Sequence, residues 1–321
     1  MNRYFSVYAA VAVLVMFCMA VPVQASGFYV SGELGMNFGE KVDMTGKSND
    51  RASVCDGYIN PRYAEVEGTA GYESYNCTGP NRGATGDWHN SFSSDEGVLF
   101  GAAVGYRMRD SRFRLELEYF YRDTGYDDTS DVYSASGESG DKLEQELVRT
   151  IDQLGSLTSH NLFANVYMDF ETEGKLTPYI GVGVGFGFTE AEYGSLWARN
   201  SDASRITTGE GLPNATEIRE NLASTSSHAD TELDDTLFGY QLLFGVDYAL
   251  TDSLMLGVKG RWVDYDSFKD GGVEWNPLRG HPPYLRTPAQ AAGGDREHVG
   301  GRIELDDIEM FAISMNLKYQ F

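Results

Sequence analysis

Basic residues are scarce in this sequence of 321 amino acids. It contains 25 lysines and arginines against 48 aspartates and glutamates, and its formal net charge at pH 7 is -23. A protein that binds nucleic acid, or docks electrostatically on anionic lipid, needs a surplus of positive charge. The sequence therefore argues against both classes, and we expect no nucleic acid among its partners.

Long apolar runs are also absent after the first 25 residues, so we expect no membrane-spanning helix in the mature chain. Residues 1–25 read MNRYFSVYAAVAVLVMFCMAVPVQA: one basic residue, a short apolar run and a small-residue pattern at the end. This order is typical of a secretory signal peptide, and we predict cleavage between Ala25 and Ser26. The alternative, an uncleaved anchor, needs about 20 apolar residues. The mature chain, residues 26–321, then forms a single domain.

Cysteine is rare, and only two cysteines follow the predicted signal peptide, Cys55 and Cys77. An exported chain with two thiols is a disulfide candidate, so we predict that these two residues are bonded to each other. A zinc site is the competing interpretation, but only His89 lies nearby and zinc normally takes four ligands. We therefore predict no metal site.

Histidine is equally scarce, which bears on catalysis. Of five histidines only His160 lies near a predicted strand, beside Ser159. Neighbouring residues of a strand point to opposite faces, so these two cannot act together as nucleophile and base. We predict no catalytic residues, no enzyme activity and no cofactor.

What the sequence does contain is an alternation of apolar and polar residues with a period of two. Residues 112–122 illustrate it, because five large apolar side chains alternate with Arg114, Glu116, Glu118 and Arg122. Such alternation is typical of β-strands, and a tilted strand crosses a bilayer in about ten residues. Eight segments of about that length carry the pattern: 28–38, 97–108, 112–122, 160–170, 178–188, 236–248, 254–263 and 311–321.

The connections between these segments are alternately long and short. The short ones are residues 109–111, 171–177 and 249–253, and the long ones are residues 39–96, 123–159, 189–235 and 264–303. Short turns at one end and long loops at the other are typical of outer-membrane barrels. A sheet in hydrocarbon must also close, because each unpaired backbone group there is costly. The predicted fold is all-β: an eight-stranded antiparallel transmembrane up-and-down β-barrel with four long extracellular loops.

Three motifs point to a family. After residue 25 the chain opens with GFYVSGELGMNF, contains TPYIGVGVGFGF at residues 177–188 and ends in FAISMNLKYQF. In these features it resembles the eight-stranded outer-membrane barrels of Gram-negative bacteria, the OmpA/OmpX-like, porin-like and surface-antigen group. The resemblance implies a multi-pass protein of the cell outer membrane, in contact with lipid and lipopolysaccharide. It also implies that Tyr319 and Phe321 belong to the terminal signal read by the barrel assembly machinery.

Ten charged residues occupy inward positions of the predicted strands. They are Glu33, Arg107, Arg114, Glu116, Glu118, Asp169, Asp247, Lys259, Arg261 and Lys318. Five acids and five bases share a narrow space where an unpaired ion is costly, so we predict that they pair and plug the lumen. The predicted ion-pair network is centred on Glu33, Arg114, Glu116, Glu118, Lys259 and Arg261. The alternative is a thin water-filled channel.

The long connections hold most of the acidity of the chain. Within the second, residues 141–154 (DKLEQELVRTIDQL) have apolar residues at helical spacing, which predicts a short helix over the barrel mouth. We predict a non-enzymatic surface protein with a membrane-integrity, adhesion or surface-antigen role, whose loops contact host or matrix ligands. The alternative is a small porin-like channel or transporter for small solutes. The long first loop, residues 39–96, favours the surface protein.

Overall fold

The computed structural model describes residues 27–51, 85–126, 130–131, 133–134, 147–206, 215–224, 226–275 and 300–321. The predicted signal peptide, its cleavage site between Ala25 and Ser26, and the predicted disulfide between Cys55 and Cys77 lie outside the described residues. Within the described ranges, no helix has both the length and the apolar character needed to cross a membrane.

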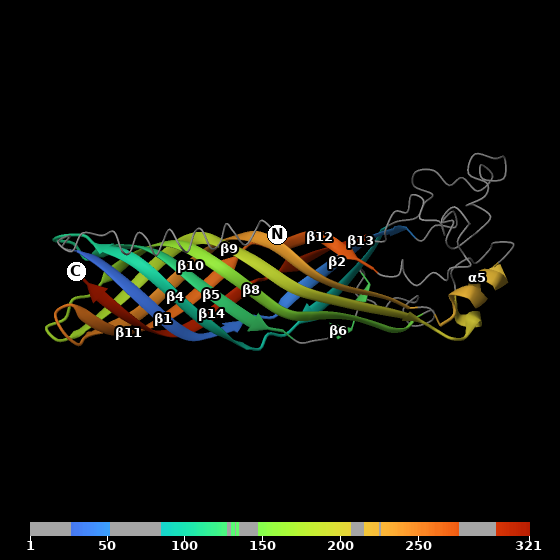
Figure 1. Ribbon diagram of the computed structural model, residues 1–321, viewed down its shortest axis with the longest axis horizontal. Coiled ribbons are helices and arrows are strands. Elements are labelled where there is room, and N and C mark those ends of the chain that lie inside the picture. The colour runs from blue at the N-terminus through green and yellow to red at the C-terminus, as the bar shows by residue number, and fades with distance from the viewer. Residues whose placement is uncertain are drawn as a thin grey trace, which may run out of the picture.

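Eight antiparallel strands close into one barrel (Figure 1). They are β1 (Phe28–Gly39), β4 (Glu96–Arg107), β5 (Phe113–Gly125), β8 (Leu147–Asp169), β9 (Leu176–Arg199), β10 (Ser226–Ala249), β11 (Leu254–Tyr265) and β14 (Glu309–Gln320). Each strand pairs with the next in this order, and β1 pairs with β14 to close the barrel. The predicted eight-stranded up-and-down topology is confirmed.

The alternation along β5 explains why one face of this sheet meets lipid. Successive side chains of a strand point to opposite faces, so Arg114, Glu116 and Glu118 are buried inside the barrel. Leu115 and Leu117, between them, face outward and are 47% and 40% exposed. Outward apolar side chains recur on all eight strands. Together they form an apolar belt around the barrel, as lipid contact requires.

Aromatic pairs mark both edges of the apolar belt. At the edge with the short turns, the rings of Phe28 and Tyr106 are 4.9 Å apart. At the opposite edge, Tyr240 packs against Trp262 with ring centroids 5.8 Å apart. Aromatic girdles at the two membrane interfaces are typical of transmembrane barrels.

Beyond the belt the barrel continues as a second structure, which we call the outer section. It contains a sheet in the order β12-β13-β2-β3-β7 and the outer parts of β8, β9 and β10, residues 147–158, 190–199 and 226–235. The sheet comprises β2 (Val42–Arg51), β3 (Thr85–Phe92), β7 (Tyr133–Ser134), β12 (Phe268–Glu274) and β13 (Gly300–Asp306). Four of these strands continue β1, β4, β11 and β14 after breaks of two or three residues. The outer section lies at the end of the barrel away from the C-terminus (Figure 1).

Three short elements complete the described part of the chain. β6 (Ser130–Asp131) pairs with the outer part of β8. A 3-10 helix, η2 (Ala203–Arg205), and an α-helix, α5 (Ala215–Leu222), lie in the connection between β9 and β10.

Two expectations about the long connections are wrong. Much of the predicted loops 123–159 and 189–235 is strand, because β8, β9 and β10 run for 23 or 24 residues. The predicted loops 39–96 and 264–303 also contain strands, namely β2, β3, β12 and β13. The predicted helix at 141–154 is wrong at 147–154, which belong to β8, whereas 141–146 lie outside the described residues. A register shift between Leu154 and Leu157 lets both side chains face the interior, although they are three residues apart. The alternation with a period of two is therefore interrupted at this point of the sequence.

The outer section encloses an apolar core. Its buried side chains include Met44 of β2, Trp88 of β3, Leu154 of β8, Leu233 of β10, Val273 of β12 and Ile303 of β13. The Trp88 ring packs edgewise against Trp197 and against Trp275, with centroids 5.8 Å apart in both pairs. The barrel interior therefore changes from charged inside the belt to apolar beyond it.

Glycines on β9 make room for large interior side chains of the neighbouring strand β8. A Cβ at Gly181 would lie 2.5 Å from the Tyr167 ring, and one at Gly185 would lie 2.2 Å from the Leu162 carbonyl oxygen. Gly185→Val is expected to lower the free energy of unfolding by about 1–3 kcal/mol, because the backbone of β8 cannot rotate away. Urea unfolding of the folded barrel measures this cost.

The matched control is Gly32→Val on β1, where a Cβ would meet nothing within 4 Å. We expect it to be nearly neutral, since surface changes usually fall within about 0.5 kcal/mol of the wild type. Equal costs for the two variants would contradict the role assigned to Gly185.

Candidate functional site in the barrel interior

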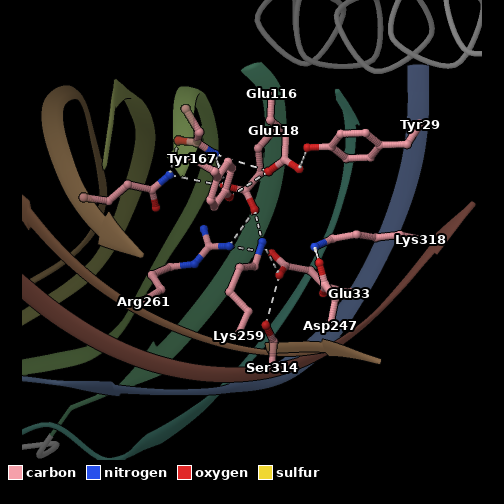
Figure 2. Close-up of polar contacts among 12 residues, drawn as sticks. Tyr29, Glu33, Glu116, Glu118, Tyr167, Asp247, Lys259, Arg261, Ser314 and Lys318 are labelled. Atoms are coloured by element: carbon pink, nitrogen blue, oxygen red, sulfur yellow. Dashed lines mark hydrogen bonds and ion pairs between the residues drawn. The ribbon is translucent and has the colours of Figure 1, made fainter. Parts of the chain in front are cut away.

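Four charged side chains converge inside the apolar belt, and we call them the central ion cluster. Glu33 comes from β1, Glu118 from β5, and Lys259 and Arg261 from β11. All occupy inward positions and are only 1% to 8% exposed. Figure 2 shows that they point toward one another from different parts of the barrel wall.

The central ion cluster pairs two bases with two acids. Lys259 Nζ lies 2.5 Å from Glu118 Oε1 and 2.7 Å from Glu33 Oε2. Arg261 Nη2 lies 2.7 Å from Glu118 Oε1 and 2.6 Å from Glu33 Oε1. Each cation thus bridges both carboxylates, which offsets the cost of removing four charges from water.

Neutral polar side chains complete the hydrogen bonding of the two acids. Asn165 Nδ2 and Gln241 Nε2 donate to Glu118 Oε2 at 2.8 and 3.2 Å. Ser314 Oγ donates to Glu33 Oε2 at 3.0 Å. The predicted network includes none of these three donors, although each occupies an inward position in the alternation of its strand.

Arg114 belongs to a second group, nearer the short turns, which we call the Arg114 cluster. Its Nε lies 2.9 Å from Asp169 Oδ1 and its Nη1 lies 3.7 Å from Asp247 Oδ2. Arg107 Nη2 lies 3.1 Å from Asp169 Oδ2, and Lys318 Nζ lies 2.6 Å from Asp247 Oδ2. The structure therefore divides the predicted network, and Arg114 pairs with acids that lie outside its predicted centre.

Glu116 lies between the two clusters and is held by tyrosines. The hydroxyls of Tyr29 and Tyr167 each donate to its carboxylate at 2.8 Å. The guanidinium carbon of Arg114 lies 5.6 Å from the Tyr29 ring centroid and 4.7 Å from that of Tyr167. These cation–π contacts connect Glu116 to the Arg114 cluster through the two rings.

A sixth basic residue, Arg122, also faces the interior, so the predicted set of ten inward charges is incomplete. It has the same parity on β5 as Arg114 and is fully buried. Its Nε donates to Ser159 Oγ at 2.9 Å. The alternation of residues 112–122 places it on the polar face, but the predicted set of inward charges leaves it out.

Ser159 and His160 point to opposite faces of β8. The Ser159 hydroxyl contacts Arg122 inside the barrel, whereas His160 Nδ1 lies 2.7 Å from the Tyr119 hydroxyl on the outer face. They are not arranged as nucleophile and base. Among the residues that the structure describes, no group of three or more histidines, cysteines and acids could hold a metal ion.

A buried carboxylate that sequence analysis missed lies in the outer section. Asp152 of β8 is fully buried. Trp88 Nε1 and Asn90 Nδ2 donate to its Oδ2 at 2.6 and 2.5 Å, and the Tyr193 hydroxyl donates to its Oδ1 at 2.9 Å. Burial raises the pKa of Asp152 to about 6, although the hydrogen bonds that it accepts act in the opposite direction.

The C-terminal residues lie at the closure between β14 and β1. The Phe321 N–H donates to the Phe28 carbonyl oxygen at 3.0 Å, and the rings of Tyr319 and Phe321 are 5.3 Å apart. Tyr319 is 48% exposed on the outer surface of the barrel. The role of these two residues in assembly stays a prediction.

A closed barrel of eight strands, with an apolar belt outside and charged side chains inside, defines a transmembrane barrel of the Gram-negative outer membrane. Residues 22–198, more than half of the chain, match the family described as Surface antigen, and the chain belongs to this family.

Relatives and solved structures were also found. Two uncharacterized proteins, from Brucella suis biovar 1 and Brucella melitensis biotype 1, are each 25% identical over 297 residues, covering 92% of this chain and 85% of theirs. Neisserial surface protein A is similar in structure, with 12% identity, a TM-score of 0.36, and coverage of 92% of this chain and 98% of that chain. The outer membrane protease OmpT from Escherichia coli has 11% identity, a TM-score of 0.37, and coverage of 94% and 100%.

Proposed function

We propose that this protein is a closed, non-enzymatic surface barrel whose outer section binds a host or matrix ligand, in an adhesion, surface-antigen or membrane-integrity role. The observation that carries the proposal is the polarity of the outer section. Beyond the belt, the strands turn apolar side chains such as Leu233 inward and acidic side chains such as Glu232 outward. A folded structure with its own core thus presents a charged face to the cell exterior.

The acidic face lies on the paired outer parts of β9 and β10. Glu190 lies opposite Asp234, and Glu192 lies opposite Glu232. Like charges directly opposite each other, such as Glu192 and Glu232, destabilise a strand pair. A basic surface on a ligand would neutralise this face and be attracted to it over a distance.

Two features support a closed interior. Inside the belt the central ion cluster and the Arg114 cluster occupy the lumen with buried, paired side chains. Beyond the belt the apolar core fills the outer section. The alternative function, a small porin-like channel or transporter for small solutes, needs a continuous water path past both.

The test combines conductance with binding. In planar bilayers, we expect the mature protein to give no large, steady conductance steps. In a binding assay, bacteria producing the triple variant Glu190→Lys, Glu192→Lys and Glu232→Lys should bind host or matrix preparations about tenfold more weakly than the wild type. Wild-type binding should also weaken as ionic strength rises.

The matched control is Asp252→Lys, which reverses an exposed charge in the short β10–β11 turn at the other end of the barrel. Binding should be unchanged in this variant. Steady conductance steps would support the channel instead, and unchanged binding by the triple variant would contradict a ligand role for the acidic face.

A further inference from the structure

Arg122 lies where the charged interior meets the apolar one. On β5 it follows Glu118 of the central ion cluster along the same inward face. β8 places Ser159 opposite it, and Leu157, two residues further on, already belongs to the apolar core. The Arg122 side chain is fully buried at this boundary.

The contacts of Arg122 satisfy only part of its guanidinium. Nε donates to Ser159 Oγ at 2.9 Å, and the guanidinium carbon lies 5.0 Å from the centroid of the Tyr265 ring. Nη1 and Nη2 have no hydrogen-bond partner among the described residues. The hydroxyl of Tyr126, the residue that follows β5, also has none among them. Burial raises the pKa of Tyr126 and the charge of Arg122 partly offsets this, so the two groups interact electrostatically.

The acids of the described interior are engaged elsewhere. They are Glu33 and Glu118 in the central ion cluster, Asp169 and Asp247 in the Arg114 cluster, Glu116 between them, and Asp152 in the outer section. Every other buried arginine of the barrel has a carboxylate within ion-pair distance. Among the described residues, Arg122 is therefore the one buried arginine without a carboxylate within ion-pair distance, in a place where a locally uncompensated charge is unfavourable.

We propose that the Arg122 guanidinium binds one small monovalent anion of the halide class inside the barrel. The N–H groups of Nη1 and Nη2, directed from a rigid planar fork, suit an acceptor anion. A single negative charge at this position neutralises the Arg122 guanidinium locally. A divalent oxyanion would leave an excess negative charge and lose more hydration on entering an apolar boundary.

Crystals of the mature protein grown with bromide in place of chloride test the site directly, and need no variant. We expect an anomalous bromine peak within hydrogen-bond distance of Arg122 Nη1 and Nη2. Density at that position without an anomalous signal would identify water and overturn the proposal. A bromine peak only at the protein surface would mean an adventitious ion only, and would overturn it as well.

Thermal unfolding in detergent, at matched ionic strength, gives a second readout. Changing the anion from gluconate to bromide should raise the unfolding midpoint of the wild type by about 2–4 °C, because the ion binds the folded state. Arg122→Met should lose this response. Arg302→Met, which removes the same charge from an exposed position of β13, should retain it. An equal halide response in Arg122→Met would place the effect elsewhere and contradict the proposal.

Discussion

Replacing Glu118 with alanine is expected to cost about 3–5 kcal/mol of the free energy of unfolding. Glu118 is 1% exposed, and the donors of Lys259 and Arg261 lie 2.5 and 2.7 Å from its Oε1. Alanine would leave these two buried cations with Glu33 as their only acid, so one positive charge loses its partner. Urea unfolding of the barrel in vesicles measures the cost.

A double variant tests this reason for the loss. Glu118→Gln combined with Arg261→Met removes one acid and one base, so it should be more stable than Glu118→Gln alone, although it lacks more native contacts. Glu190→Gln removes a carboxylate from an exposed position of β9 and should stay within about 0.5 kcal/mol of the wild type. If Glu118→Ala were as stable as Glu190→Gln, the central ion cluster would contribute nothing measurable to stability.

The barrel itself could be predicted from the sequence because the membrane imposes one simple rule. Inside the belt, every outward side chain meets hydrocarbon, so the apolar parity stays constant along each strand. On β10 this holds for Phe238, Leu242 and Phe244, which are 45% to 49% exposed. Eight segments that obey the same rule, with long and short connections in turn, leave little choice of topology.

The outer section could not be predicted because this rule reverses at the edge of the belt. Further toward the N-terminus of β10, the apolar residues Leu233 and Leu237 face inward and Asp234 faces outward. A strand that changes its apolar parity midway loses its period of two at the crossing point. The outer parts of β8, β9 and β10 therefore resemble loops or a helix in the sequence, although they are continuous with membrane strands.

The ionic residues were predictable as a set, but their partners were not. The alternation of inward and outward residues assigns Arg114, Asp169 and Glu118 to the interior. It does not specify how far along the barrel axis each of them lies. The register between strands sets that position. Arg114 lies opposite Tyr167, and Asp169 is two residues beyond Tyr167 toward the short β8–β9 turn, whereas Glu118 lies opposite Phe163. Which acid pairs with which base therefore depends on the register between neighbouring strands, and the pattern of a single strand does not reveal that register.

Replacing Asp152 with alanine is expected to lower the stability of the outer section by about 3 kcal/mol or more. The change would leave the indole N–H of Trp88, the amide of Asn90 and the hydroxyl of Tyr193 without their acceptor in a buried site. Limited proteolysis and tryptophan fluorescence should detect earlier opening of the outer section. The gel migration of the unheated barrel should stay unchanged, because the belt and its ion clusters are intact. If the outer section opened and the unheated gel migration changed together, the outer section and the membrane barrel would unfold as one unit.

Asp152→Asn separates the charge of this residue from its volume. Burial raises the pKa of Asp152 from 3.8 to about 6, so the folded state binds this proton more tightly than the unfolded state. The stability that protonation contributes is therefore fully present below a pH of about 4 and is lost as the pH rises through about 6, a change of about 3 kcal/mol at most. The wild-type outer section should resist unfolding better toward the acidic end of this window, and the asparagine variant should lack that component. Other carboxylates titrate in the same range, so the decisive quantity is the difference between the stability–pH profiles of the wild type and of Asp152→Asn. Identical profiles would show that Asp152 does not cause the pH dependence.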